Sequence, residues 1–249
     1  MNKYFPVLIA FVVLSFSCKN QETVLDAKSI VNKAIEVAGG TKFNTSTISF
    51  DFRDKHYVGI RNNGIFQLER HFKDSIIQIK DVLSNDGFQR YKDEVAFTVP
   101  DSMAPRYSRS VNSVHYFSIL PFGLNDTAVN KTYLNEVTIK GKAYYKIKVD
   151  FNQDGGGDDF EDVFVYWISK DEFKVDYIAY SYMDNAVDLG LRFREAFNER
   201  YINGIRFVDY NNYKPETGVK DLLSLDLLFE ANKLKLLSKI ENENVEVDL

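Results

Sequence analysis

Apolar and polar residues alternate along most of the chain between residues 45 and 99. Ile48, Phe50 and Phe52 are separated by polar residues, which is the period expected of a strand with one buried face. Asn-Asn-Gly at 62–64 and Asn-Asp-Gly at 85–87 are typical of tight hairpin turns. The pattern therefore predicts a meander of antiparallel strands at 45–52, 56–61, 65–72, 75–83 and 88–99.

A second meander follows, and its strands are more apolar. Gly141-Lys142 and Asn203-Gly204 mark two of its turns. Residues 163–169 (VFVYWIS) are apolar on both faces, which indicates a central strand that is covered on both sides. The predicted strands are 136–140, 143–151, 163–169, 173–182, 189–197, 205–213, 225–229 and 235–241.

Two segments instead repeat their apolar residues at the helical period. Residues 23–37 place apolar side chains on one face. Thr23 with Asp26 fits a capping box, and Gly39-Gly40 fits a helix end. Residues 102–120 have a spacing nearer to helical than to alternating, before Pro121 and Gly123. We expect an N-terminal helix and a helical insert between the two meanders.

These elements predict an α+β fold that is mainly antiparallel β. About eleven strands with short turns favour one strongly curved sheet or half-barrel, with the N-terminal helix and the insert as lid. No internal repeat or linker separates the halves, so residues 23–249 are expected to form a single domain. The concave face of such a sheet must be packed, covered or occupied by a ligand, and the chain has 20 Phe and 15 Tyr to line it.

The start of the chain has the features of a targeting segment. Residues 1–3 carry a positive charge, and residues 4–16 form an apolar run too short to span a bilayer. Cys18, the one cysteine of the chain, follows a small residue at the end of this run, which resembles a bacterial lipobox. The resemblance implies a signal peptide over 1–17, an acylated Cys18 and a tether over 18–22. The alternative is an ordinary signal peptide with an incidental cysteine.

Charge and motif content exclude several classes of function. The net charge of −5 and the lack of a basic patch argue against a nucleic-acid partner. The three histidines, His56, His71 and His115, form neither an HxH nor an HExxH motif, so a zinc site is not predicted. No nucleophile elbow, P-loop or dinucleotide fingerprint is present, and the sequence does not predict an enzyme.

The acidic loop 150–161 (DFNQDGGGDDFE) has the ligand spacing of a calcium-binding loop. It resembles the EF-hand loop over twelve residues, although strands rather than helices flank it. If calcium binds, we expect it to pin the hairpin between strands 143–151 and 163–169. The alternative is a solvated, Gly-rich turn. The candidate calcium ligands are Asp150, Asn152, Asp154, Gly156, Asp158 and Glu161.

Polar residues on two neighbouring predicted strands form a second candidate site. Alternation places Arg192 and Arg194 on one face of their strand and Glu195 on the other. On the next strand, Arg206 and Asp209 lie on opposite faces. The set is interpreted either as a solvated face with weak ion pairs or as a polar ligand site formed by Arg192, Arg194, Arg206 and Asp209.

Four short runs carry a resemblance to a known family. They are PFGLND at 121–126, GGGDDFEDVFVY at 155–166, FREA at 193–196 and NGIRF at 203–207. In these the chain is similar to a family of Gram-negative lipoproteins with a domain of unknown function. The predicted architecture also resembles the LolA/LolB-like carriers, in which a half-barrel with a helical lid holds acyl chains.

Three functions remain open at this point. The first is an anchored module that binds a lipid or another hydrophobic ligand. The second is a structural or partner-binding lipoprotein with a packed concavity, and the third is an envelope enzyme that uses the acidic region 158–162. Lys19 after Cys18 does not resemble an inner-membrane retention signal, so the lipoprotein resemblance implies attachment to the outer membrane, on its periplasmic or surface side.

Overall fold

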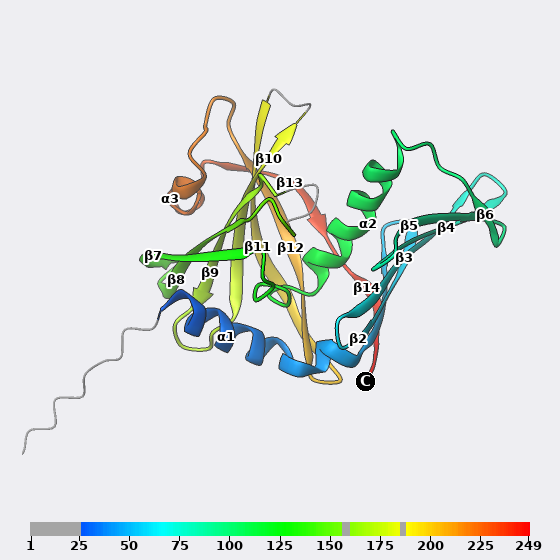
Figure 1. Cartoon of the computed structure of the whole chain (residues 1–249). Coiled ribbons are helices and arrows are strands. Elements are labelled where there is room, and N and C mark those ends of the chain that lie inside the picture. Colours follow the sequence, from blue (N-terminus) through cyan, green and yellow to red (C-terminus); the bar gives the residue numbers. More distant parts are fainter. Residues whose placement is uncertain (1–25, 156–159, 185–187) are drawn as a thin grey trace, which may run out of the picture.

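The computed structural model describes residues 26–155, 160–184 and 188–249. In this part of the chain, two antiparallel sheets of seven strands each curve around a space that contains helix α2 (Figure 1). The expected class, a mainly antiparallel and strongly curved β fold with an N-terminal helix and a helical insert, is confirmed.

The first sheet combines the N-terminal meander with the last strand of the chain. Its strands are β1 (Thr47–Phe52), β2 (Lys55–Asn62), β3 (Ile65–Asp74), β4 (Ile77–Ser84), β5 (Gly87–Lys92), β6 (Val95–Phe97) and β14 (Glu243–Asp248). Their order in the sheet is β14-β1-β2-β3-β4-β5-β6. Asn63 and Gly64 both have positive φ in the β2–β3 turn, as a two-residue hairpin loop requires, and the turn predicted at 62–64 is correct.

The second sheet contains the second meander. Its strands are β7 (Val129–Ile139), β8 (Lys142–Phe151), β9 (Val163–Ser169), β10 (Val175–Asp184), β11 (Asp188–Ile202), β12 (Ile205–Pro215) and β13 (Leu234–Ile240). They follow one another as β13-β12-β11-β10-β9-β8-β7. The chain passes from β13, at the edge of this sheet, directly into β14, at the edge of the first. The described residues therefore form fourteen strands in two sheets, where the sequence predicted about eleven strands in one.

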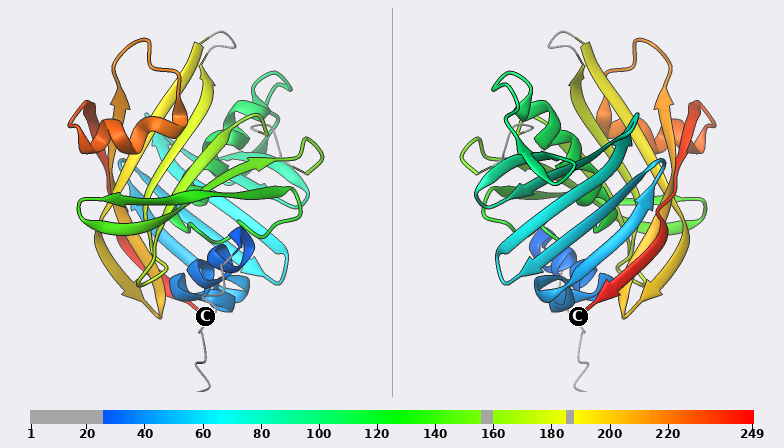
Figure 2. Two further views of the ribbon diagram at one scale, coloured as in Figure 1. Left: turned by 90° about the vertical axis from the view of Figure 1, so that its left-hand side faces the viewer. Right: turned by 90° about the vertical axis from the view of Figure 1, so that its right-hand side faces the viewer.

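Three α-helices and two short 3₁₀ helices complete the described chain. They are α1 (Ala27–Ala38), η1 (Gly40–Thr45), α2 (Ala104–Ser118), η2 (Leu222–Ser224) and α3 (Leu225–Glu230). Helix α1 runs along one end of the molecule, α2 lies between the sheets, and α3 lies outside the second sheet (Figures 1 and 2). We call the side of the second sheet that faces α1 and α2 its inner face, and the side that faces α3 its outer face.

Both faces of strand β9 are buried, as the sequence predicted. Tyr166 and Ile168 pack on the inner face with Ile30 and Val31 of α1. On the outer face, Trp167 packs in a cluster that includes residues of α3. Helix α1 therefore packs on one face of β9, and helix α3 packs on the other.

Several predicted elements differ from the structure in type or extent, and three of these differences have a local reason. Residues 225–229 lie in helix α3 rather than in a strand, because Leu225 and Phe229 bury one face of the helix against the outer face of the second sheet. The strand predicted at 88–99 is broken by Asp93 and Glu94, which turn with positive φ. Helix α1 begins after Asp26, whose carboxylate caps Ser29 N at 2.7 Å, whereas Thr23 was the predicted cap and lies outside the described residues.

Candidate functional site

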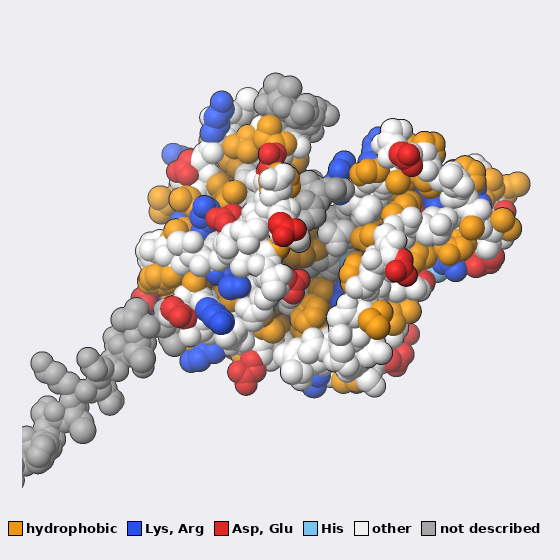
Figure 3. Space-filling view, viewed as in Figure 1, with side chains coloured by type: hydrophobic (Ala, Val, Ile, Leu, Met, Phe, Trp, Pro, Cys, Tyr) orange, Lys and Arg blue, Asp and Glu red, His pale blue; other side chains and the backbone are white. Residues whose placement is uncertain are grey.

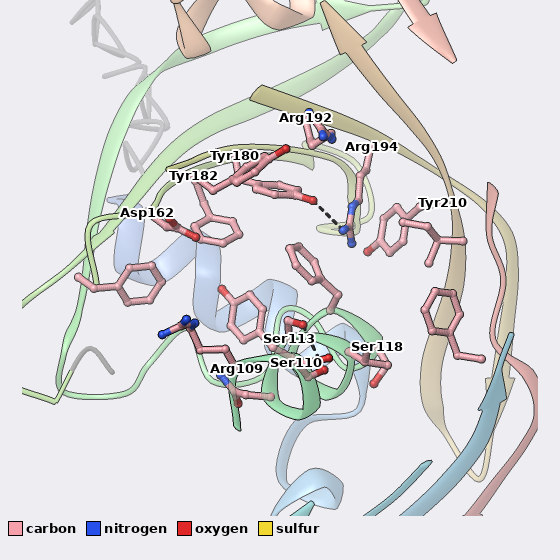
Figure 4. Close-up of a pocket in the computed structure, with 18 of the residues that line it drawn as sticks. Arg109, Ser110, Ser113, Ser118, Asp162, Tyr180, Tyr182, Arg192, Arg194 and Tyr210 are labelled. Carbon is pink, nitrogen blue, oxygen red and sulfur yellow. Dashed lines mark hydrogen bonds between the residues drawn. The ribbon is translucent and has the colours of Figure 1, made fainter. Parts of the chain in front are cut away.

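A cavity of about 660 Å³ lies between α2 and the inner face of the second sheet. The space-filling view is hollowed between the sheets, with hydrophobic side chains in the hollow (Figure 3). Aromatic rings form much of the cavity wall (Figure 4). The aromatic residues are Phe52, Tyr116, Phe117, Phe151, Phe164, Tyr180, Tyr182 and Tyr210, and the charged ones are Arg109, Glu161, Asp162, Arg192 and Arg194.

Two polar contacts hold helix α2 on the first sheet. His115 Nε2 lies 3.0 Å from the carbonyl oxygen of Glu69, and Arg70 Nη1 donates to Ser110 Oγ at 2.6 Å. Gly59 makes room for the imidazole, since a Cβ at this position would lie 3.2 Å from His115 Nδ1. One side of α2 therefore packs on the first sheet, and the other side faces the cavity.

The cavity side of α2 carries an adjacent pair of aromatic residues. The Tyr116 hydroxyl lies 2.8 Å from the Tyr166 hydroxyl, and the Phe117 and Tyr180 rings are 5.1 Å apart. Burial raises the pKa of Tyr116 and of Tyr166 well above the usual value and that of Tyr210 to about 12. These hydroxyls therefore stay neutral at physiological pH, and the cavity wall keeps its apolar, hydrogen-bonding character.

Arg194 is the buried cation of this cavity. Its guanidinium lies 3.6 Å from the centre of the Phe117 ring and donates from Nη2 to the Tyr180 hydroxyl at 2.8 Å (Figure 4). Arg192, two residues earlier on the same face, is half-buried and lines the cavity beside Tyr182. Glu195 points to the outer face, where it accepts from the Tyr213 hydroxyl, so the predicted alternation along β11 is correct.

The structure does not bring all four residues of the predicted polar site together. Arg192 and Arg194 line the cavity, but Arg206 and Asp209 do not. Arg206 is buried in an ion pair with Glu199 at 3.1 Å. Asp209 is buried against Arg200, with 3.1 Å between charged atoms. The bulge of β11 between Phe197 and Arg200 lets these residues pair locally, and such a break in register was not visible in the sequence.

The predicted calcium loop lies only partly within the described residues. Gly156 and Asp158 fall outside them. Asp150 pairs with Lys148 at 3.0 Å, and Asn152 Oδ1 accepts from Asn130. The side chain of Glu161 lines the cavity. Within residues 26–155, 160–184 and 188–249, no group of three or more His, Cys, Asp or Glu could hold a metal ion, and calcium binding by the loop, Asp154 included, stays a prediction.

The targeting segment and its acylation site also lie outside the described residues. Cys18 and the tether precede Asp26, where the description begins. Among the helices that the structure does describe, none is long and apolar enough to cross a membrane. The expected lipid anchor therefore stays a prediction.

The sequence analysis identified Arg194 but missed the aromatic wall on α2. Two signals were present. Tyr180 and Tyr182 repeat at the strand period on β10, and Tyr116-Phe117 sits in the helical insert that was expected to cover the sheet. The two signals could be assigned to one site only if α2 was known to lie between the sheets. That position depends on long-range packing such as the close approach of His115 to Gly59.

The chain is similar to one protein family and to several solved structures. Residues 2–242 match the model of a family described as a family of unknown function, DUF6503. A LolA superfamily protein from Nitrosomonas europaea is similar in structure, with 11% identity, 90% of this chain and 92% of that chain covered, and a TM-score of 0.49. A DUF1329 family protein from Desulfovibrio piger is similar at 11% identity, with 90% and 94% covered and a TM-score of 0.44. No curated protein matches the chain.

Proposed function

The chain belongs to the DUF6503 family of unknown function. From its cavity and from the sequence of its N-terminal segment, we propose that it is an anchored envelope protein that binds a lipid or another hydrophobic small molecule. The observation that carries the proposal is the aromatic cavity under α2. Its volume of about 660 Å³ lies in the range of small-molecule sites, which run from about 300 to 1,000 Å³.

The chemistry of the wall supports an apolar ligand. Phe117, Phe164 and Tyr180 present ring faces and edges to one another at 5.1 to 6.0 Å between ring centres. An acyl chain in contact with such rings gains about 0.8 kcal/mol for each buried methylene. An open cavity also speaks against the packed concavity that the partner-binding alternative requires.

No specific observation favours the enzyme alternative. Of the acidic region 158–162, Glu161 and Asp162 line the cavity, and Asp158 lies outside the described residues. A carboxylate that lines an aromatic cavity can equally orient a bound amphiphile.

The proposal is tested by filling the cavity. Ser113 lies on the cavity side of α2, so Ser113→Trp should occupy the space and remove the ligand. Arg106→Trp is the matched control, since Arg106 is exposed on the same helix and does not line the cavity. Native mass spectrometry of protein purified from the envelope after expression of the full chain should show a lipid-sized adduct in wild type and Arg106→Trp, and at least tenfold less in Ser113→Trp.

Two results would refute this function. One is a bare polypeptide mass for the wild type that persists when hydrophobic ligands are added. The other is an adduct that survives in Ser113→Trp at the wild-type level, which would place the ligand elsewhere.

A further inference from the structure

The charge of Arg194 is unbalanced inside the protein. In the described part of the chain three arginines are buried: Arg70, Arg194 and Arg206. Arg70 pairs with Asp81, and Arg206 pairs with Glu199. Arg194 is 7% exposed, yet no carboxylate of a described residue lies within ion-pair distance, and its Nε has no hydrogen-bond partner there.

A buried cation without a counter-charge is costly. The penalty of moving a charge out of water is normally offset by an opposite charge and by hydrogen bonds to every donor. Arg194 has the Tyr180 hydroxyl, the face of Phe117 and the neutral side chain of Asn212 across the strand pair. None of these carries a negative charge, so an anionic partner is missing from this position.

The surroundings of Arg194 suit one small anion. Its guanidinium lies 5.9 Å from the centre of the Tyr210 ring, and the Tyr210 hydroxyl has no hydrogen bond to any described residue. Tyr180 accepts from Arg194 and has its own proton left to donate. Tyr180 and Tyr210 flank the guanidinium in the cavity, and Asp162 lies across the cavity from it (Figure 4). A carboxylate beside Arg194 would accept from one guanidinium and two hydroxyls.

The apolar wall of the cavity indicates that the bound anion carries a hydrophobic chain. Phe117 stacks on Arg194, and from there Phe164 and Phe151 extend the aromatic wall of the cavity. We propose that the cavity binds a long-chain monocarboxylate, with its carboxylate on Arg194, Tyr180 and Tyr210 and its chain along the aromatic wall. This inference rests on the proposed function and names the class of ligand that the same site selects.

The test compares ligands that differ only in the head group. Palmitate and hexadecanol are titrated at pH 8 against a hydrophobic fluorescent probe bound to delipidated protein, prepared from the full chain. Wild type should bind palmitate more tightly than hexadecanol, on the order of tenfold to a hundredfold, as a charge-assisted hydrogen-bond site does. Arg194→Met should bring this ratio close to one and leave the affinity for hexadecanol within about threefold.

Lys239→Met is the matched control. It also removes one positive charge from the second sheet, but Lys239 is exposed on β13 and does not line the cavity, so the preference for palmitate should persist. The melting temperature separates a ligand role from a structural one. Because Arg194 has no internal counter-charge, Arg194→Met should melt at or above the wild-type temperature.

Each outcome decides the inference. Equal binding of palmitate and hexadecanol by the wild type overturns the carboxylate site and leaves the proposed hydrophobic function standing. An unchanged ratio in Arg194→Met also overturns it. Failure of the wild type to bind either ligand overturns the proposed function together with the inference. If Arg194→Met does not fold, the ratio measured on the wild type still decides.

Discussion

At the scale of single residues, His115 makes the stability of the contact between α2 and the first sheet depend on pH. It is 2% exposed, and burial lowers its pKa from 6.5 to about 4, with the nearby Arg61 charge acting in the same direction. In the folded protein it is neutral, while in the unfolded chain it binds a proton below about pH 6.5. The unfolded state therefore holds more protons between pH 6.5 and 4, so the stability due to neutral His115 is present above 6.5 and lost as the pH falls.

We predict that the titration of His115 alone lowers the free energy of unfolding by about 3 kcal/mol as the pH falls from 6.5 to 4. Urea unfolding of the wild type at pH 7.5, 6, 5 and 4 should show a falling free energy of unfolding. His115→Gln should be less stable at pH 7.5 but fall less steeply, because its side chain does not titrate. Since other groups titrate equally in both proteins, the difference between the two curves isolates His115. Parallel curves would contradict the prediction.

At the scale of elements, one buried ion pair adds to the apolar packing of helix α3 on the second sheet. Lys146 Nζ lies 3.0 Å from both carboxylate oxygens of Asp226 and donates to Leu223 O at 2.6 Å. Trp167 Nε1 donates to the same carboxylate at 3.3 Å. Asp226→Ala should therefore cost about 3–5 kcal/mol, because it leaves Lys146 buried without a counter-charge.

The matched variant removes both charges. Lys146→Met with Asp226→Leu fills the space with apolar atoms and should recover most of the stability lost in Asp226→Ala. Urea denaturation of the three proteins measures the difference. A double variant as unstable as the single one would show that the geometry of the pair, rather than the stranded charge, holds α3 in place.

The same helix shows where sequence reasoning stopped. Asp226 stands between Leu225 and Leu227, so the segment alternates like a strand, and the partner that makes a buried carboxylate acceptable is eighty positions away. Strand β9 was predicted correctly because its burial on both faces is visible in its own residues. Arg194 was identified for its charge and strand position, but its lack of a counter-charge depends on the uncharged side chains of Phe117, Tyr180 and Asn212 that the fold places around it. Local periodicity predicted the elements, and long-range contacts decided the site.

At the scale of the whole molecule, the cavity exists because α2 lies between two sheets instead of covering a single curved one. His115 and Ser110 hold it to the first sheet, and Tyr116 and Phe117 face the second. The walls of the cavity therefore come from segments far apart in the chain. A ligand in contact with Phe117 and Arg194 touches both α2 and the second sheet, so binding should stabilise their relative placement.

We expect the location of the protein to depend on Cys18, the one cysteine of the chain. If the expected acylation occurs, the N-terminal peptide of envelope-purified protein begins at residue 18 and carries the mass of acyl chains. Several chains on one residue hold a protein at a membrane stably, whereas one holds it only marginally. The wild type should therefore sediment with membranes and show no reaction with maleimide, since no free thiol remains, and Cys18→Ser should carry no acyl mass. A wild type that reacts stoichiometrically with maleimide would instead show an incidental cysteine, and the cavity would then belong to a protein without this anchor.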